Sequence, residues 1–405
     1  MRILIVSNLY PPIAFGGYEV ECAGVVERLR EQHDVRVLTS KPPAGTEVPE
    51  DPEVWRELEL LTPDSHGARR APLAVLPAVA AARRALQWEP ELTYVWNGSS
   101  ISQAALRVLA DSDVPIAFRI CEHWFGGLFL EDQFLRELLP AERGAARSAW
   151  AGACRLLNGR RALRLDPTAP LRTAICWNSE AIKRLVQTPT FVEPVLERVV
   201  HSVPRYGDRY AAIERDPAPE PEILYVGRVM PYKGVWLAIE ALASLRAELG
   251  IAARLEIIGP EDAQHGAELR RVAEQHGVAD AVRWRGQQSP EQVAAALAHA
   301  HALIVPSVWD EPFPLVTIEG ALARVPLVAA DVGGIGEGMH DEEHALLFER
   351  LDAAGATRAL ARVLGEPEQT AARVERALAR ARTFGFEPYL DAQEQFVLDA
   401  RAAQR

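Results

Sequence analysis

Two blocks of alternating strands and helices predict an α/β protein with two domains, each built on a parallel sheet. The 405 residues are enough for two or three domains of ordinary size. Each block repeats short apolar runs separated by amphipathic stretches, and this repetition favours parallel sheets covered by helices on both sides. Ligand sites are then expected at the carboxyl ends of the strands.

The strands are expected at short apolar or alternating runs. In the first block these are Ile3–Ser7, Val35–Thr39, Leu92–Trp96, Ile116–Ile120 and Thr173–Asn178. In the second block they are Ile223–Val226, Leu255–Ile258, Val282–Arg285, Ala302–Val305 and Leu327–Ala330. Two blocks of this kind predict two Rossmann-like domains.

The polar, proline-rich stretch Arg205–Pro221 marks the expected break between the domains. We therefore expect a first domain over residues 1–205 and a second over residues 218–387. A last helix is expected within residues 388–405, from Pro388 to about Ala402.

Composition and charge exclude several classes of protein. Hydrophobic residues make up 48% and charged residues 25% of a chain with a net charge of −12, which is typical of a soluble globular protein and argues against a general nucleic-acid binder. The four cysteines are far apart, so reduced thiols are expected and a zinc site is not. No apolar run reaches the roughly 18 residues of a membrane span, and a cytoplasmic location is expected.

One segment is basic in this acidic chain. Between Arg143 and Arg172 there are seven arginines and a single acid, Asp166, with leucines interleaved. The segment is either a solvated helix–loop face or a contact with an anionic acceptor or the inner face of a membrane, and the first interpretation is favoured.

The most informative stretch is Glu311–Glu319, which follows an apolar strand and opens a helix. Pro312 and Pro314 suit the first turn of a helix. Backbone N–H groups from Phe313 to Val316 would then form an anion site at the positive helix end. Glu311 falls in the loop and Glu319 about a turn inside the helix, so both can face one ligand. The alternative is a helix start with two solvated acids.

Glycine-rich turns follow other strands. One such turn, from Gly227 to Gly234, places Arg228 and Lys233 at the carboxyl end of a strand. The two cations suit a diphosphate at this position. The alternative is a surface turn with two exposed bases. Gly16-Gly17 lacks a full GxGxxG pattern, so it supports close approach of a ligand better than a nicotinamide cofactor. Val282–Gly286, with Arg283 and Trp284, is interpreted as an edge strand near a bound base.

Metal ligands are not predicted. Asp111-Ser-Asp113 matches the Asp-x-Asp tripeptide of metal-dependent sugar transfer, but it precedes a strand and is assigned to a helix–strand loop. We therefore expect neither a metal nor a cofactor.

These motifs resemble the retaining, metal-independent glycosyltransferases of family four. The matching elements occur in family order and cover nearly the whole chain: Gly16-Gly17, Asn178–Lys183, Gly227-Arg228 with Lys233-Gly234, Val282–Gly286, Glu311–Glu319 and Gly333–Glu337. The resemblance implies the glycosyltransferase-B fold, in which two Rossmann-like domains face each other across a cleft and the last helix crosses back to the first domain.

The resemblance also implies residue roles. Arg228 and Lys233 would neutralise the diphosphate of a nucleotide-sugar donor, Glu311 would contact the sugar, and Glu319 would hold the ribose hydroxyls. Amides of Phe313, Pro314, Leu315 and Val316 would bind sugar hydroxyls and phosphate. Gly16, Gly17, Gly227, Arg283 and Trp284 complete the expected donor site, and the first domain would bind the acceptor.

One position departs from the family pattern. The family usually has a His-Asp pair after the fourth strand of the first domain, where this chain has Cys121 and Glu122, with His123 shifted by two. Either His123 replaces the missing group, or Glu122 and its neighbours orient the sugar differently. The second interpretation is favoured because Trp124-Phe125 fixes the register.

The resemblance implies a hexosyltransferase that acts with retention of configuration and without a metal. The donor would be a UDP-sugar or, less favoured, a GDP-sugar. The acceptor hydroxyl would belong to a small molecule, a glycan or a lipid-linked glycan. Two alternatives are a non-catalytic nucleotide-sugar-binding relative, which the altered His-Asp position favours, and an epimerase on the same fold, which the Glu-x7-Glu segment argues against.

Overall fold

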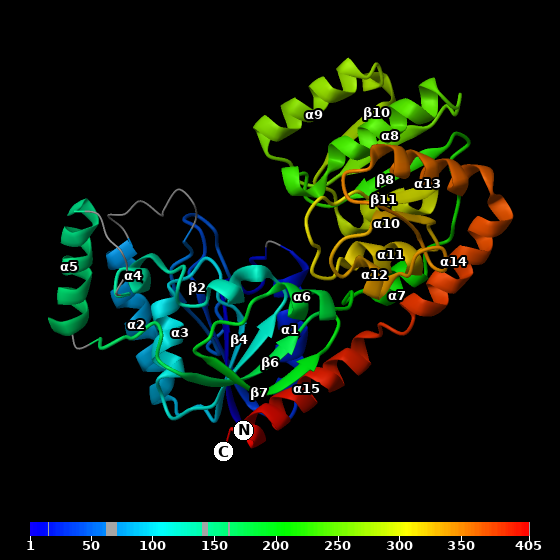
Figure 1. Ribbon diagram of the computed structural model, residues 1–405. Coiled ribbons are helices and arrows are strands. Elements are labelled where there is room, and N and C mark those ends of the chain that lie inside the picture. Colours follow the sequence, from blue (N-terminus) through cyan, green and yellow to red (C-terminus); the bar gives the residue numbers. More distant parts are fainter. Residues whose placement is uncertain (15, 62–70, 140–144, 161–162, 405) are drawn as a thin grey trace. The chain divides into compact units, whose positions relative to one another are not determined.

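The computed structural model describes residues 1–14, 16–61, 71–139, 145–160 and 163–404 (Figure 1). The chain forms two compact units. The first unit comprises Met1–Asn178, Ile182–Val200 and Tyr389–Arg405, and the second comprises Ser179–Ala181 and His201–Pro388.

The first unit contains a seven-stranded sheet in the order β3-β2-β1-β4-β5-β6-β7. Every neighbouring pair is parallel. The strands are β1 (Arg2–Ser7), β2 (Asp34–Ser40), β3 (Val54–Leu58), β4 (Leu92–Asn97), β5 (Ile116–Ile120), β6 (Leu171–Trp177) and β7 (Val192–Val199). The helices are α1 (Gly17–Arg30), α2 (Ala71–Gln87), α3 (Gln103–Ala110), η2 (His123–Gly127), α4 (Gln133–Arg136), α5 (Ala145–Arg160), α6 (Glu180–Leu185) and α15 (Phe386–Ala403).

The second unit contains a six-stranded parallel sheet in the order β10-β9-β8-β11-β12-β13. The strands are β8 (Glu222–Val226), β9 (Arg254–Ile258), β10 (Val282–Gly286), β11 (Ala302–Val305), β12 (Leu327–Ala330) and β13 (Leu346–Phe348). The helices are α7 (Gly207–Ala211), η3 (Pro231–Lys233), α8 (Val235–Ala247), α9 (Ala263–Gln275), η4 (Ala279–Ala281), α10 (Pro290–His299), α11 (Leu315–Leu322), α12 (Ile335–Gly338), α13 (Ala353–Gly365) and α14 (Pro367–Ala381).

All ten predicted strands are confirmed, and three strands were missed. The missed strands, β3, β7 and β13, lie at sheet edges. Edge strands are short, half-exposed and tolerant of proline and charge, so they lack a clear apolar signal. β7 contains Pro194 and exposed glutamates, and β13 has three residues.

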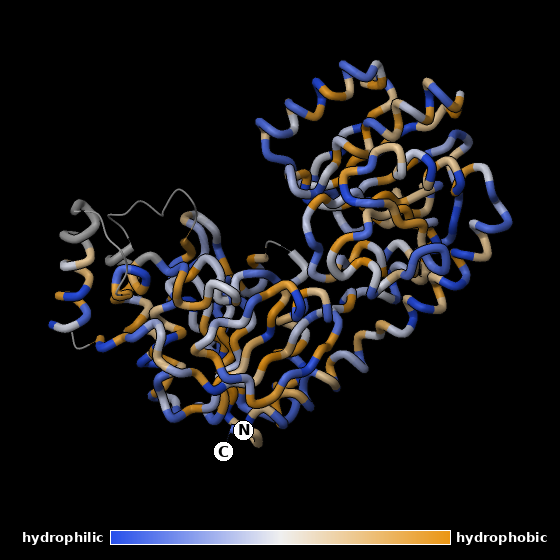
Figure 2. The backbone as a smooth tube through the Cα atoms, in the orientation of Figure 1, coloured by the Kyte–Doolittle hydropathy of each residue, from blue (hydrophilic) through white to orange (hydrophobic). Residues whose placement is uncertain are grey.

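The core of each unit lies along its sheet, where apolar residues follow the strands (Figure 2). The last helix contributes to the first unit, because Phe396, Val397 and Ala400 of α15 are fully buried. The Tyr94 hydroxyl of β4 also donates a hydrogen bond to Gln393 Oε1 of α15 at 2.8 Å. The expected helix is therefore confirmed, and it begins at Phe386, two residues earlier than predicted.

The basic segment lies partly outside the described residues, which exclude Arg143 and Arg161 as well as the side chain of Arg147. Arg155, Arg160 and Arg164 are exposed, and Leu156 on α5 is 52% exposed. Among the described residues, no helix is long and apolar enough to cross a membrane.

Candidate active site

The structure brings Lys233 and Glu311 together beyond the carboxyl ends of β8 and β11. Lys233 Nζ lies 2.6 Å from Glu311 Oε1. Glu311 is buried, and the Ser307 hydroxyl also donates to its Oε1 atom. A buried carboxylate needs such partners, because an unpaired charge away from water is strongly unfavourable. The pair thus lies at a strand-end ligand position.

Two glycines allow the loops around this pair to approach each other. Gly234 has a φ of +65°, and a Cβ atom there would lie 2.0 Å from the Pro306 carbonyl oxygen. Gly333 has a φ of +57°, and a Cβ atom there would lie 2.2 Å from the Glu311 carbonyl oxygen. Any larger residue would push apart the loops that carry Lys233 and Glu311.

Two aromatic rings flank Lys233. Its Nζ atom lies 5.7 Å from the ring centroid of Tyr232 and 5.4 Å from that of Trp309. The two rings are 5.0 Å apart, and the Val308 N–H donates to the Tyr232 carbonyl at 3.0 Å. The Lys233 ammonium group is therefore held both by cation–π attraction to the two rings and by its ion pair with the Glu311 carboxylate. No sequence motif marked Ser307 or Trp309, because their roles depend on this packing.

The helix that the Glu311–Glu319 segment was predicted to open is α11. α11 begins at Leu315, with Pro314 as its N-cap residue, and its first turn closes with a bond from the Thr317 N–H to the Pro314 carbonyl at 3.2 Å. The prediction that amides of all residues from Phe313 to Val316 bind a ligand was wrong at Pro314, because proline has no N–H. The N–H groups of Leu315 and Val316 remain at the positive end of the helix.

Glu319 lies one turn inside α11, as predicted, and is half-buried. Burial raises the pKa of Glu319 to about 7, and a hydrogen bond with Tyr210 of α7 partly opposes the shift. The side chain therefore changes its charge near neutral pH.

Arg228 is exposed, with its guanidinium carbon 6.0 Å from the Tyr232 ring centroid. The Tyr225 hydroxyl donates to the Arg228 carbonyl at 2.7 Å and fixes the backbone just after Gly227. The side chain thus projects from the same turn that carries Lys233.

The structure does not bring Arg283 and Trp284 together with the Lys233–Glu311 pair. β10 is an edge strand, as predicted, but Arg283 Nη1 pairs with Glu222 Oε1 at 3.2 Å and with Glu256 Oε2 at 3.6 Å. Glu222 begins β8, whereas Lys233 follows its other end. Trp284 lies under the Arg270 guanidinium at 4.4 Å. Donor contacts of Arg283 and Trp284 therefore stay predictions.

In the first unit, the turn after β1 carries Gly16 and Gly17 at the start of α1. Gly16 is the N-cap residue, and its N–H donates to Glu19 Oε2 at 3.0 Å. This carboxylate occupies part of the positive helix end that an anionic ligand would use. A neutral group is better suited to this turn than a phosphate.

Cys121 and Glu122, which stand where the family usually has its His-Asp pair, directly follow β5. Burial raises the pKa of the Cys121 thiol, so Cys121 is neutral and cannot exchange protons as a histidine would. Glu122 is half-buried and occupies the N-cap position of η2, while His123 is exposed. Beneath them, buried Arg119 pairs with Glu21 at 3.1 Å and donates to the Val200 carbonyl at 2.7 Å, which fixes the end of β5.

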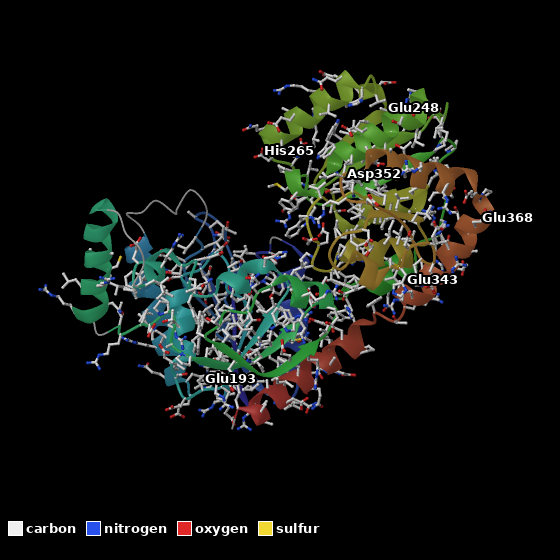
Figure 3. The ribbon with its side chains drawn as sticks, viewed as in Figure 1. Glu193, Glu248, His265, Glu343, Asp352 and Glu368 are labelled. Carbon is white, nitrogen blue, oxygen red and sulfur yellow. The ribbon has the colours of Figure 1, made fainter. Side chains whose placement is uncertain are left out.

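Both groups of candidate metal ligands include side chains that have partners within the chain. Asp111-Ser-Asp113 lies in the predicted helix–strand loop, and Asp111 pairs with Arg107 at 2.6 Å. His340, Glu343 and His344 cluster among the described residues (Glu343 is labelled in Figure 3). However, the His340 N–H donates to His344 Nδ1 at 3.1 Å, so the neutral His344 ring carries its proton on Nε2 and offers no free nitrogen.

A family model described as glycosyl transferases group 1 matches residues 208–380. This range contains β8 to β13 and the Lys233–Glu311 pair. The second unit therefore matches this family of transferases over most of its length, and the two α/β units of the chain have the glycosyltransferase-B fold.

Individual relatives and solved structures agree with this family. The chain is 34% identical to a D-inositol 3-phosphate glycosyltransferase of Nocardia farcinica over 45% of this chain and 42% of that relative, so less than half of the relative is matched. It is 26% identical to a glycogen synthase of Mycobacterium tuberculosis over 100% of this chain and 96% of that protein. Sucrose-phosphate synthase from Thermosynechococcus elongatus superposes with a TM-score of 0.71 at 20% identity, over 99% of both chains.

Proposed function

We propose that this protein transfers a hexosyl unit, with retention of configuration and without a metal, from a nucleotide diphosphate sugar to an acceptor hydroxyl. The observation that carries the proposal is the ion pair of half-buried Lys233 with buried Glu311 beside the start of α11. It combines a cation for phosphate, a carboxylate for sugar hydroxyls and two helix-start amides at one strand-end position.

In the proposed reaction, the bond between the sugar carbon and the diphosphate oxygen breaks, and a bond to the acceptor oxygen forms on the same face. The acceptor proton passes to the leaving phosphate oxygen. Lys233, Arg228 and the amides of Leu315 and Val316 stabilise the negative charge that grows on the diphosphate. These fixed charges would do the work that a metal does in other transferases.

UDP is the favoured donor nucleotide. HepE from Anabaena has been solved in complex with UDP and glucose, and it superposes on this chain with a TM-score of 0.68 at 17% identity, over 98% of this chain and 100% of that one. In our proposal Glu319 accepts hydrogen bonds from the ribose hydroxyls, which a carboxylate can do for two hydroxyl groups at once. Glu311 contacts the sugar.

The first unit is proposed to bind the acceptor, which is a small molecule, a glycan or a lipid-linked glycan. Exposed Arg155, Arg160 and Leu156 on α5 support contact with an anionic membrane surface in the cytoplasm. Sedimentation with anionic and neutral vesicles would test this contact. Equal binding of both kinds of vesicle, or of neither, would contradict it.

The test of the donor site is binding and slow hydrolysis of UDP- and GDP-sugars, with and without EDTA. We expect one UDP-sugar to bind equally well with and without the chelator and to release its sugar slowly. Loss of binding in EDTA would contradict metal independence, and no binding of any nucleotide sugar would contradict the donor site.

A second candidate is a nucleotide-sugar-binding protein without transferase activity. The neutral, buried Cys121 in place of the family histidine favours it. It predicts donor binding with neither hydrolysis nor transfer to any acceptor. An epimerase on the same fold would instead release an altered sugar, which product analysis in the same assay would reveal.

A further inference from the structure

A surface pocket of about 560 Å³ lies at the opposite end of the second-unit sheet from the Lys233–Glu311 pair. His301 directly precedes β11, and Arg324 and Pro326 precede β12. These residues mark the amino ends of two neighbouring parallel strands. The end of α13 and the first turns of α14 form the remaining wall. The pocket is therefore separate from the proposed donor site.

The pocket carries excess positive charge in an acidic chain. Arg215 and Arg324 line it, and within the described residues neither forms a salt bridge to a carboxylate. Arg215 donates to the carbonyls of Leu297, Ala298 and Ala300 at the end of α10. Arg324 makes a longer bond to the Ala211 carbonyl at 3.4 Å, so most of its guanidinium donors are available. The lining includes one acid, Glu375, which is exposed.

His301 adds a neutral donor. Its Nδ1 atom accepts a hydrogen bond from the Glu222 N–H at 3.1 Å. Burial and then the charge of Arg215 lower the pKa of His301, so the ring is neutral at pH 7. The single ring proton must therefore lie on Nε2, which can donate to an oxygen anion.

The other walls are apolar or helical. Val363 and Leu364 end α13, Pro326 precedes β12, and Ala371 and Val374 belong to α14. Pro367 and Thr370 place the positive amino end of the 15-residue helix α14 at the pocket. The volume lies within the usual range for sites that bind small organic molecules.

We propose that this pocket binds a small organic anion, with its carboxylate or phosphate group on Arg324 and His301 and its apolar body against Val363, Leu364 and Pro326. The charge of the pocket selects an anion, and its apolar walls exclude a fully hydrated ion such as free phosphate. The proposal does not depend on the transferase reaction.

Saturation-transfer NMR with benzoate as the probe tests the proposal, with benzyl alcohol as its uncharged counterpart. We expect benzoate to receive saturation from the wild-type protein, and benzyl alcohol to receive less. Arg324→Gln, which removes the charge, and Ala371→Trp, which fills the pocket, should each reduce the benzoate signal by about fivefold or more.

Ala379→Trp is the matched control, because Ala379 is an exposed residue of α14 that does not line the pocket. Circular dichroism and the melting temperature will show whether each variant is folded. No transfer to benzoate in the wild-type protein, or an unchanged signal in folded Ala371→Trp, would overturn the proposal.

Discussion

Lys233 forms an ion pair with Glu311, so a diphosphate bound by Lys233 would share or replace this partner. Lys233→Ala should lower turnover by about 100-fold or more, because it removes a charge that stabilises the leaving diphosphate. Steady-state kinetics with the best UDP-sugar will measure the loss. Near-normal turnover would remove Lys233 from the proposed mechanism.

The control for this variant is Arg254→Ala. Arg254 begins β9 and pairs with exposed Glu220 at 2.8 Å, far along the strand from the carboxyl end. We expect its turnover to stay within about twofold of the wild type, since exposed pairs contribute little. A comparable loss in both variants would indicate a general effect of charge.

Glu319 should make stability fall as the pH rises. Its pKa increases from 4.5 to about 7 on folding, so the folded protein binds more protons than the unfolded chain between these values, and stability falls across this window. Glu319→Gln cannot ionise. Its free energy of unfolding relative to wild type should increase from about pH 5 to about pH 8 by the order of 1–3 kcal/mol.

Urea unfolding at the two pH values will measure this difference. Glu248→Gln is the control, because Glu248 is exposed at the end of α8 (Figure 3). A pH-independent difference for Glu319→Gln would show that burial does not shift this carboxyl group.

The sequence predicted the residues of the site better than their partners. Lys233 and Glu311 stand in recognisable segments, and the structure brings them together. Tyr210, Trp309 and Ser307 carry no such signal, since Tyr210 comes from α7, the other two come from the loop after β11, and their roles depend on packing. Arg283 lies in a recognisable motif, but the motif did not predict its ion pairs with Glu222 and Glu256.

The turn after β12 is a close fit to the loop of Glu311, and its glycine should be sensitive to any side chain. Gly333→Ala should destabilise the protein more than Gly277→Ala and should weaken UDP binding. Both glycines have positive φ, but a Cβ atom at Gly277 has nothing within 4 Å, whereas one at Gly333 meets the backbone of Glu311 at 2.2 Å.

Urea unfolding and calorimetric titration with UDP will compare the two variants. Backbone strain alone should cost about 1–2 kcal/mol in Gly277→Ala, and crowding should add to this in Gly333→Ala. Equal losses of stability and unchanged UDP binding would show that the loop can relax.

At the level of elements, interior strands were predictable, whereas the edge strands β3, β7 and β13 were not, and β10 was the one edge strand predicted. β1, β4 and β8 are almost wholly apolar because both faces are buried. β3 has the sequence Val-Trp-Arg-Glu-Leu and β7 includes a proline, and both pair on one side only. Their place in the sheet depends on the neighbouring strand and not on local sequence alone.

Across the whole molecule, the last helix should determine the stability of the first unit. Phe396→Ala should destabilise that unit by about 3–5 kcal/mol, because it leaves a cavity at a fully buried ring that lies 5.6 Å from Tyr94. Differential scanning calorimetry should show a lower melting temperature for one transition.

Leu398→Ala is the control for this change, since Leu398 lies on the same helix and is 39% exposed. Its effect should be within about 0.5–1 kcal/mol of wild type. Equal shifts in the two variants would mean that α15 is not part of the core of the first unit.

The return of α15 to the first unit also sets an order of events during synthesis. The second unit is an insertion between Val200 and Tyr389, so the ribosome completes it before the final piece of the first unit exists. Gln393 and Phe396 follow the second unit along the chain, so they are synthesised after it. The first unit therefore finishes folding only after the second unit has been made, in reverse of the usual vectorial order, and a nascent chain stalled before Phe386 would expose the surface that α15 later covers.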